Sequence, residues 1–252
     1  MFEIVILSII QGATEFLPIS SSSHLIIVSE YLKFENQNLS IDVSLHIGSF
    51  FAVLTYFYKD IFNFVKNKEL LIKIITSSLP VMIVGFLLIK TNLIYDLRNI
   101  KIIGWTTLIF GILLYFSDKF NNEKNIINNF SYKSAIFIGL LQIFSLVPGV
   151  SRSGITITAA RFLKFSRYDS SKISFLLSIP TLGAVSFHGI SSMIKSNNLI
   201  FTTFNLSAVI CSFIFSYITI KIFLKYIKKA SLTIFVIYRI ILAFILLGFA
   251  YL

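Results

Sequence analysis

Charged side chains are scarce in this sequence. Asp, Glu, Lys and Arg together make up 13% of the 252 residues, whereas 56% of the residues are hydrophobic and the mean hydropathy is +0.86. About a quarter of the residues are charged in a typical soluble domain, so this composition excludes a soluble globular protein. The sequence predicts an integral membrane protein.

Acidic residues are the rarer charged type. There are 11 of them against 22 Lys and Arg, and the formal net charge is +11. A basic balance can indicate nucleic-acid binding, but no basic cluster alternates with exposed aromatic residues on a polar face, so we expect no nucleic-acid partner. Basic loops on the cytoplasmic side of a membrane explain the charge better.

Cysteine is nearly absent as well. The one cysteine, Cys211, lies within an apolar run, which excludes a disulfide framework and a thiolate site, and we expect it only to pack. The N-terminus has no basic region ahead of its first apolar run and carries Glu3 instead, so we expect no cleaved signal peptide.

Eight apolar segments follow one another along the chain. Several approach the roughly 20 residues that a spanning helix needs. The first and the fifth are interrupted by Pro with clustered Ser or Gly, and each is followed by three uninterrupted segments. This order predicts one membrane domain over residues 1–252 with two internal repeats, at about 1–117 and 134–252. The segments are 2–31, 43–58, 70–89, 102–116, 135–163, 173–193, 206–224 and 232–252.

We interpret both interrupted segments as re-entrant hairpins, because non-helical backbone at membrane depth must be buried in protein or line water. With Arg152 and Arg239 set aside as lying inside segments, 15 Lys and Arg then fall on one side and five on the other. Eight full spans would give 12 against eight, so the positive-inside rule favours re-entry. The predicted fold is all-α, with six spanning helices and two re-entrant helical hairpins. Three spans per half make an inverted repeat and leave both termini outside the cytoplasm.

Polar residues concentrate in the two interrupted segments. The first carries residues 11–24, and the second carries Gln142 and residues 148–156. Pro18 and the serines at 20–23 suit the start of a helix, as do Pro148 and the residues after it. Two helix N-termini that converge near the membrane midplane make an anion site, and the guanidinium of Arg152 matches phosphate oxygens. The predicted ligand is a phosphate group.

Glu15 is an ionisable residue at membrane depth, which is by default a functional-site hypothesis. Its carboxylate could hold Mg²⁺ or Ca²⁺ against phosphates or act as a general base, and it could equally pair with Arg152 as a structural bridge. Ser21 and His24 are three residues apart, so on one helix they share a face, as a nucleophile and its base would. The serines could alternatively be helix caps only.

Three further polar residues fall in apolar segments away from these stretches. We expect His46 and His188 to pack or to hydrogen-bond between helices. We expect Arg239 to reach toward the membrane surface or to pair locally, with an inner role left open.

The two polar stretches resemble the motifs of a known family. Gln11-Gly-Ala-Thr-Glu15-Phe-Leu-Pro18-Ile-Ser-Ser is similar to the first motif of the bacterial undecaprenyl-diphosphate phosphatases, also called bacitracin-resistance proteins, and Pro148-Gly-Val-Ser-Arg152-Ser-Gly-Ile-Thr156 is similar to the second. Smaller similarities occur at residues 48–52, 174–180 and 237–239, so the resemblance covers essentially the whole chain.

The resemblance implies hydrolysis of the C55 isoprenoid diphosphate to the monophosphate and inorganic phosphate. This reaction recycles the lipid carrier for peptidoglycan and other envelope polymers and confers bacitracin resistance. The resemblance also implies dependence on a divalent metal, Mg²⁺ or Ca²⁺, with Glu15 as a candidate ligand. It further implies a multi-pass protein of the bacterial inner membrane whose active site faces outward.

Site residues follow from the motif positions. Gln11 stands where the family commonly has an acidic residue, so Glu15 would carry the carboxylate chemistry alone, and Ser23 stands where a Gly commonly precedes the histidine. The resemblance implies catalytic roles for Glu15, Ser21, His24 and Arg152, and substrate binding by Gln11, Ser20, Ser151, Ser153 and Thr156.

Several alternatives stay open at this point. The attacking group could be Ser21 assisted by His24, or a water activated through Glu15. A transporter or flippase is the rival class, because inverted repeats with broken helices are a transporter design, and a non-catalytic lipid-binding protein is the third reading. The sequence leaves the preferred metal, the chain-length selectivity and the oligomeric state undetermined, with a homodimer among the candidates.

Overall fold

The computed structural model describes residues 2–32, 39–66, 68–91, 93, 97–120, 124–195 and 203–251. These ranges are mostly helical and contain no β-strand. Six of their helices are long and apolar enough to cross a membrane, which confirms the predicted all-α membrane protein. They are α3 (Leu39–Tyr56), α5 (Lys68–Lys90), α7 (Ile100–Asp118), α11 (Arg167–Lys195), α12 (Thr203–Ile227) and α13 (Thr233–Tyr251).

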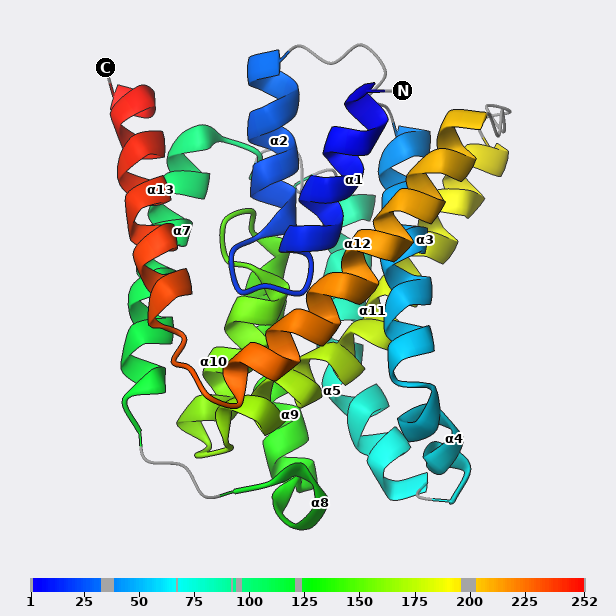
Figure 1. The fold of residues 1–252 in the computed structure, drawn as a ribbon, viewed down its shortest axis with the longest axis vertical. Coiled ribbons are helices and arrows are strands. Elements are labelled where there is room, and N and C mark those ends of the chain that lie inside the picture. The colour runs from blue at the N-terminus through cyan, green and yellow to red at the C-terminus, as the bar shows by residue number, and fades with distance from the viewer. Residues whose placement is uncertain are drawn as a thin grey trace.

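Two pairs of shorter helices enter the bundle from opposite ends (Figure 1). The helix α1 (Phe2–Thr14) descends from the top, a loop reverses the chain in the middle, and α2 (Ser21–Leu32) returns to the top. From the bottom, α9 (Tyr132–Gln142) and the short 3₁₀ helix η1 (Ile143–Leu146) rise to a second loop, and α10 (Arg152–Phe162) leads back down. Both interrupted segments are therefore re-entrant hairpins, as predicted.

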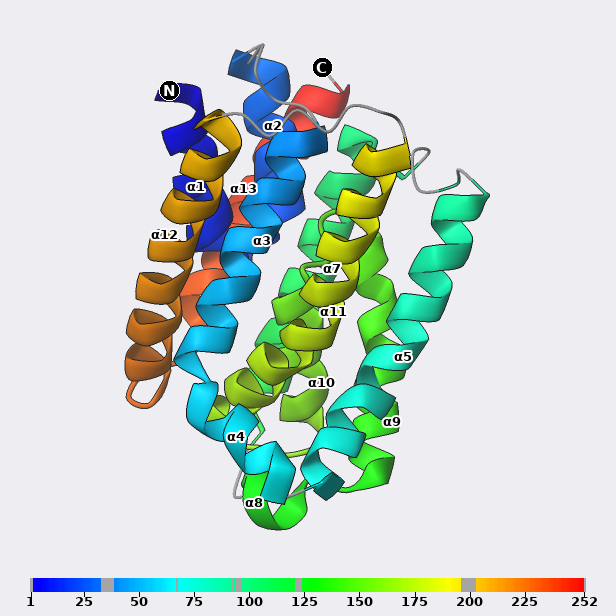
Figure 2. The ribbon, with the colours of Figure 1, turned by 90° about the vertical axis from the view of Figure 1, so that its right-hand side faces the viewer.

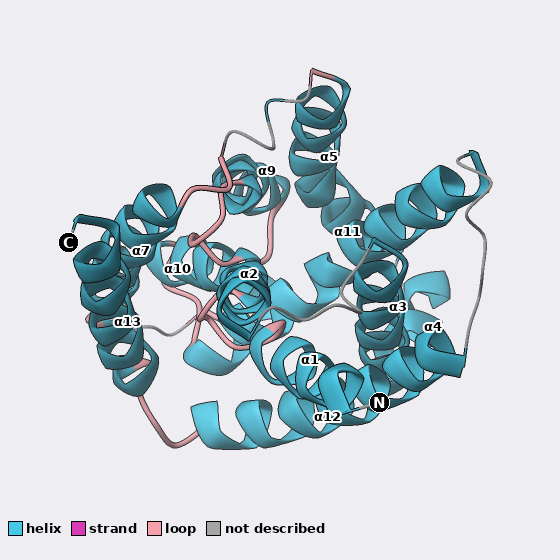
Figure 3. Ribbon diagram, turned by 90° about the horizontal axis from the view of Figure 1, so that it is seen from above, coloured by secondary structure: helices cyan, strands magenta, loops and turns pink. Residues whose placement is uncertain are grey.

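The six long helices surround the place where the hairpins meet. Seen from above, α2 lies near the centre of the ring that they form (Figure 3). The short helices α4 (Tyr58–Lys66) and α8 (Ile126–Asn129) lie at the bottom of Figures 1 and 2, and both marked chain ends lie at the top. The bottom is the end to which the charge count assigns most Lys and Arg.

Helix pairing is compatible with an inverted repeat. α1 packs on α12 as α9 packs on α5, and α3 packs on α12 as α11 packs on α5. Two further pairs, α3 with α11 and α7 with α13, join equivalent helices of the two halves. Corresponding helices of the two halves thus have corresponding neighbours, as an inverted repeat requires. The boundaries of the repeats stay a prediction.

The core centres on α11. Of the six candidate spans, α11 has the largest buried share in its most apolar window, 56%. Its Phe175 packs edge to face against Phe16 of the first hairpin loop, with 5.3 Å between ring centroids, and it also contacts Phe57 and Phe223 at 6.4 Å and 5.7 Å. Phe16 directly follows Glu15 in the chain, and the cluster of Phe16, Phe57, Phe175 and Phe223 fills the bundle toward its basic end.

Asp118 joins four elements at the basic end. Its carboxylate accepts two hydrogen bonds from Arg167, at 2.7 Å and 3.0 Å, and one from the backbone N–H of Leu232 at 3.1 Å. Arg161 pairs with the same carboxylate at 3.1 Å. The end of α7, the end of α10, the start of α11 and the start of α13 are therefore fixed to one another below the hairpin loops.

A glycine allows α3 to lie very close to α12. A Cβ on Gly48 would lie 2.4 Å from the carbonyl oxygen of Val209, which is backbone and cannot turn aside. Small residues permit such close helix contacts in membranes. One residue further along α3, the hydroxyl of Ser49 lies 2.9 Å from that of Ser216 on α12.

We expect Gly48→Ala to lower the free energy of unfolding by about 1–3 kcal/mol, because the added methyl group forces two packed helices apart. The measurement is the thermal unfolding midpoint of the purified protein in detergent. Gly248→Ala is the matched control, since a Cβ there would meet no atom of the described chain within 4 Å. Equal midpoints for the two variants would contradict the close contact.

Candidate active site

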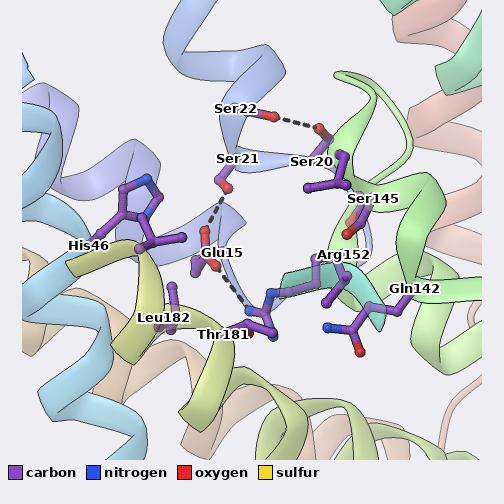
Figure 4. A pocket seen from close by; sticks show the side chains of 14 residues that line it. Glu15, Ser20, Ser21, Ser22, His46, Gln142, Ser145, Arg152, Thr181 and Leu182 are labelled. Atoms are coloured by element: carbon purple, nitrogen blue, oxygen red, sulfur yellow. Dashed lines mark hydrogen bonds and ion pairs between the residues drawn. The ribbon is translucent and has the colours of Figure 1, made fainter. Parts of the chain in front are cut away.

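A pocket of about 200 Å³ lies where the two hairpin loops meet (Figure 4). Its polar side chains come mainly from the two hairpins, and its apolar ones come from α5, η1 and α11. The lining residues are Glu15, Ser20, Ser21, Ser22, His46, Val81, Gln142, Ser145, Leu146, Ser151, Arg152, Thr181, Leu182 and Val185.

The carboxylate of Glu15 joins the two hairpins within this pocket. Glu15 directly follows α1, and its Oε2 accepts hydrogen bonds from the Ser21 hydroxyl at 2.6 Å and from Gln11 Nε2 at 3.0 Å. Its Oε1 accepts from Arg152 Nη2 at 2.9 Å (Figure 4). The bridge between Glu15 and Arg152, which the sequence left open, is thus formed. The same carboxylate also accepts a hydrogen bond from the Ser21 hydroxyl.

The two returning helices begin with matching turns. Ser20 and Ser151, the residues just before α2 and α10, have φ angles of 74° and 69°. Positive φ is disfavoured for residues other than glycine, and such strain concentrates at functional sites. Both serines and the first residues of both helices, Ser21 and Arg152, line the pocket. Two helix N-termini, each the positive end of a helix dipole, therefore face one pocket.

Unpaired donors face the same pocket. Arg152 Nη1 and both amide atoms of Gln142 are buried and find no hydrogen-bond partner among the described residues. A buried polar group without a partner is costly, so these groups are suited to a polar ligand. Gln142 belongs to the second polar stretch of the sequence, and it stands nine residues before Ser151, as Gln11 stands nine before Ser20.

Gln11 lies behind Glu15, outside the lining of the pocket. Its amide donates one hydrogen bond to Glu15 and a second to His46 Nδ1 at 3.0 Å, which requires that Nδ1 carry no proton. His46 on α3 thus shares a hydrogen bond with α1, as expected, and its side chain also lines the pocket, which was not expected. It lies in an uninterrupted apolar helix, so no interruption or motif in the sequence marked it.

His24 does not contact the Ser21 hydroxyl, so the expected direct pair is absent among the described contacts. Its Nδ1 lies 2.6 Å from the carbonyl oxygen of Ser20, and its Nε2 contacts the hydroxyl of Tyr238 on α13. The rings of His24 and Tyr238 stack with centroids 5.7 Å apart. Ser21 turns instead to Glu15, because a carboxylate is the stronger acceptor.

Ser153 and Thr156 lie outside the lining and hold the hairpins in place. The Ser153 hydroxyl donates to the carbonyl oxygen of Leu17 at 2.7 Å, which ties α10 to the first hairpin. The Thr156 hydroxyl lies 2.7 Å from that of Ser174, which ties α10 to α11. Of the expected binding residues, Ser20 and Ser151 line the pocket and Gln11, Ser153 and Thr156 support it.

Arg239 takes the inner position that the sequence left open. Its side chain is fully buried, so it does not reach the membrane surface. Its guanidinium donates to the carbonyl oxygen of Pro18 in one loop at 3.3 Å, and to those of Gly149 and Val150 in the other at 2.9 Å and 3.1 Å. A fourth bond reaches the carbonyl oxygen of Thr107 on α7 at 3.3 Å. One side chain therefore holds both loops against each other.

Glu15 offers one carboxylate ligand to a hard divalent cation. Mg²⁺ is commonly held by one or two carboxylates together with substrate phosphates and water. Glu15 supplies a carboxylate, and the buried Gln11 Oε1 beside it has no hydrogen-bond partner in the described part of the chain. No group of three or more His, Cys, Asp and Glu occurs there that could hold a metal by itself. A cation at this site would need oxygens of a bound phosphate as well.

We expect Arg239→Met to lower the free energy of unfolding by about 3 kcal/mol or more, because it leaves buried carbonyl oxygens of two loops without donors. The thermal unfolding midpoint in detergent measures the effect. Lys229→Met, the same loss of charge at an exposed position, should leave the midpoint within the error of the wild type. A similar midpoint for both variants would show that Arg239 does not hold the loops.

Comparisons with known proteins identify the family of this chain. The family model described as bacitracin resistance protein BacA matches residues 4–245. An undecaprenyl-diphosphatase from Pelagibacter ubique is 49% identical over 252 aligned residues, covering 98% of this chain and 96% of that protein. Undecaprenyl-diphosphatases from Jannaschia sp. and Roseobacter denitrificans are 37% and 36% identical, covering 100% of this chain and 99% of each relative. The chain therefore belongs to the bacitracin resistance protein BacA family.

Proposed function

We propose that this protein is an undecaprenyl-diphosphatase, which hydrolyses the C55 isoprenoid diphosphate to the monophosphate and inorganic phosphate. It would thereby recycle the lipid carrier for cell-wall synthesis. Relatives that carry this name align with the chain over nearly their whole length. The observation that carries the proposal is a pocket in which unpaired donors of Arg152 and Gln142 lie beside the Glu15–Ser21 hydrogen bond.

Binding of the diphosphate uses the groups that the pocket leaves unsatisfied. Arg152 offers Nη1 while Nη2 is held by Glu15, so its planar fork reaches phosphate oxygens from a fixed position. Gln142 adds an amide donor, and the N-terminal ends of α2 and α10 add their dipoles. Phosphoryl transfer depends mainly on such positioning and on neutralisation of charge.

The contact between Ser21 and Glu15 suits the chemical step. Ser21 Oγ attacks the terminal phosphorus and its proton passes to Glu15 Oε2, 2.6 Å away. The bond between that phosphorus and the bridging oxygen breaks, and the lipid monophosphate leaves with the electron pair. Water then attacks the phosphorus of the phosphoserine, and Ser21 Oγ leaves with the proton that Glu15 held, which restores both side chains. In the variant mechanism, a water that gives its proton to Glu15 attacks the terminal phosphorus directly, and no phosphoserine forms.

His24 acts in this scheme as a positioning residue. Its ring holds the carbonyl oxygen of Ser20 on one side and the Tyr238 hydroxyl on the other. This places the first turn of α2, and with it the hydroxyl of Ser21, relative to α13. We assign it no proton transfer with Ser21, because its ring nitrogens are engaged elsewhere.

A divalent cation, Mg²⁺ or Ca²⁺, belongs to the proposal. Glu15, with Gln11 Oε1 beside it, would hold the cation. When bound, the cation supplies charge neutralisation for the phosphate oxygens. Glu15 is the one acidic residue among those that line the pocket. It would therefore bind the cation and accept the proton with different oxygens, or do so in different steps.

Charge supports an orientation in the bacterial inner membrane. We infer that the basic end, with α4 and α8, faces the cytoplasm and that both chain ends and the pocket entrance face outward. The lipid diphosphate would then be dephosphorylated from the outer side. A homodimer stays a prediction, and none of the steps above requires a second copy.

Glu15→Gln and Arg152→Ala should each lower the release of phosphate from undecaprenyl diphosphate by about 10³-fold or more. Glu15→Gln removes the base, and Arg152→Ala removes the guanidinium charge held in the pocket. Release by purified protein in detergent is measured with Mg²⁺ and with EDTA, and EDTA should abolish it. Glu69→Gln is the control, since this exposed carboxylate lies at the basic end, where it pairs with Lys73. No release by folded wild-type protein would favour transport over hydrolysis.

Ser21→Ala separates the two attacking groups. If serine attacks, the variant loses turnover by about 10³-fold while it still binds the lipid diphosphate, and rapid acid quenching of the wild type traps phosphate on Ser21. Quenching with substrate labelled on its terminal phosphate, followed by peptide mapping, makes the measurement. A variant that keeps most of its turnover, together with an unlabelled wild type, would assign the attack to water.

A further inference from the structure

His46 is the one histidine among the residues that line the pocket, and none of the chemical steps proposed above uses it. It lies within α3, one of the six candidate membrane spans. An ionisable side chain inside a membrane is costly, and one that faces a polar cavity points to a function. The hydrogen bonds around His46 indicate what that function is.

Glu15 determines how the amide of Gln11 is turned. An ionised carboxylate only accepts hydrogen bonds, and both Arg152 and Ser21 donate to this one. The amide atom that lies 3.0 Å from Glu15 Oε2 is therefore the nitrogen, because an amide oxygen in that place would face a second acceptor. The carboxylate thus leaves the amide a single favourable orientation.

The same amide nitrogen determines the tautomer of His46. Gln11 Nε2 carries two hydrogens, and it lies 3.0 Å from Glu15 Oε2 and also 3.0 Å from His46 Nδ1. One hydrogen goes to each neighbour, so Nδ1 accepts. A neutral imidazole carries one proton, which must then be on Nε2.

The Nε2–H group of His46 is free to bind a ligand. None of the described residues accepts a hydrogen bond from Nε2, whereas Nδ1 is bonded to Gln11, which lies behind the lining of the pocket. The imidazole itself lines the pocket. A donor that has no acceptor in the protein suits the oxygens of a phosphate, which accept strong hydrogen bonds.

His46 reaches the pocket from a different side than the other free donors. Figure 4 shows His46 on one side of Glu15, and Arg152 and Gln142 on the other. Arg152 Nη1 and the amide of Gln142 are the unpaired groups there. A diphosphate that lies over the Glu15–Ser21 hydrogen bond would therefore meet donors from both sides.

We propose that His46 is a substrate-binding residue, which donates a hydrogen bond from Nε2 to an oxygen of the bound diphosphate. Gln11 holds it in the tautomer that can donate. This inference rests on the proposed function and adds to it a binding residue and the group that orients that residue. His46 transfers no proton in this role, because loss of the Nε2 proton from a neutral ring would leave an anion.

Two substitutions separate this binding role from a purely structural one. An asparagine amide reaches about as far as Nδ1, so His46→Asn keeps an acceptor for Gln11 and loses the donor at Nε2. A glutamine amide reaches about as far as Nε2, so His46→Gln keeps a donor in the pocket. We expect His46→Asn to lower kcat/KM for undecaprenyl diphosphate by about tenfold or more, mainly through KM, and His46→Gln to stay within about threefold of the wild type.

His188→Gln is the matched control, because His188 is exposed on α11 and does not line the pocket. Its kcat/KM should equal that of the wild type. The reverse order, with a larger loss in His46→Gln than in His46→Asn, would show that His46 only supports Gln11 and would overturn the proposal.

Nitrogen NMR tests the tautomer in the wild type, so this measurement does not depend on the folding of any variant. The chain has three histidines, whose isotope-labelled rings can be resolved in detergent. His46 should show a proton on Nε2 and none on Nδ1. Methylenediphosphonate, a diphosphate analogue with carbon in place of the bridging oxygen, should shift its Nε2–H signal and leave the signals of His188 unchanged. A proton on Nδ1 instead, or an Nε2–H signal that stays fixed when the analogue saturates the protein, would reject the proposal.

The two proposals fail in different ways. A folded wild type that releases no phosphate from undecaprenyl diphosphate rejects the proposed function. A wild type that releases phosphate, together with full activity of His46→Asn, rejects the role of His46 alone.

Discussion

Every carbonyl oxygen of a broken helix needs a donor inside a membrane, and this requirement determines how the two hairpins meet. Water cannot supply that donor in the hydrocarbon core, where each unsatisfied group costs several kcal/mol. Arg239 supplies such donors, because its guanidinium hydrogen-bonds to carbonyl oxygens of both loops and of α7. Arg239 belongs to α13, the last helix, so the positions of both loops depend on a contact with the C-terminal helix of the described chain.

The site follows from that arrangement. With the loops fixed, two helix N-termini face one pocket, and Glu15 comes within reach of Ser21 from its own hairpin and Arg152 from the other. A buried pair of opposite charges is weak evidence for stability, since desolvation offsets much of the attraction. Its retention beside unpaired donors is better explained by a ligand that takes over part of the bonding. In the proposed function, the same groups that look structural in the free protein become the binding groups.

Composition and interruptions in the apolar segments were sufficient to predict six spans, two re-entrant hairpins and a polar site at their junction. Pro18, Pro148 and the adjoining serines mark breaks that no continuous helix tolerates well. The positions of His46, His24 and Arg239 could not be predicted in this way. Each lies on a regular helix, and which way its side chain faces depends on tertiary packing that periodicity does not encode. The Ser21–His24 spacing pointed to a pair, but a nearer carboxylate and a tyrosine on α13 attract the two side chains in different directions.

The aromatic cluster under Glu15 has a consequence for the cell that would contain this protein. An enzyme that takes a charged headgroup to membrane depth must hold water there, and a water column that crossed the bilayer would let protons and ions flow down their gradients. Phe16, Phe57, Phe175 and Phe223 fill the bundle from the residue next to the carboxylate toward the basic end. In the proposed function, substrate would enter and leave at one face, and this packed cluster would separate the water in the pocket from the basic end of the bundle.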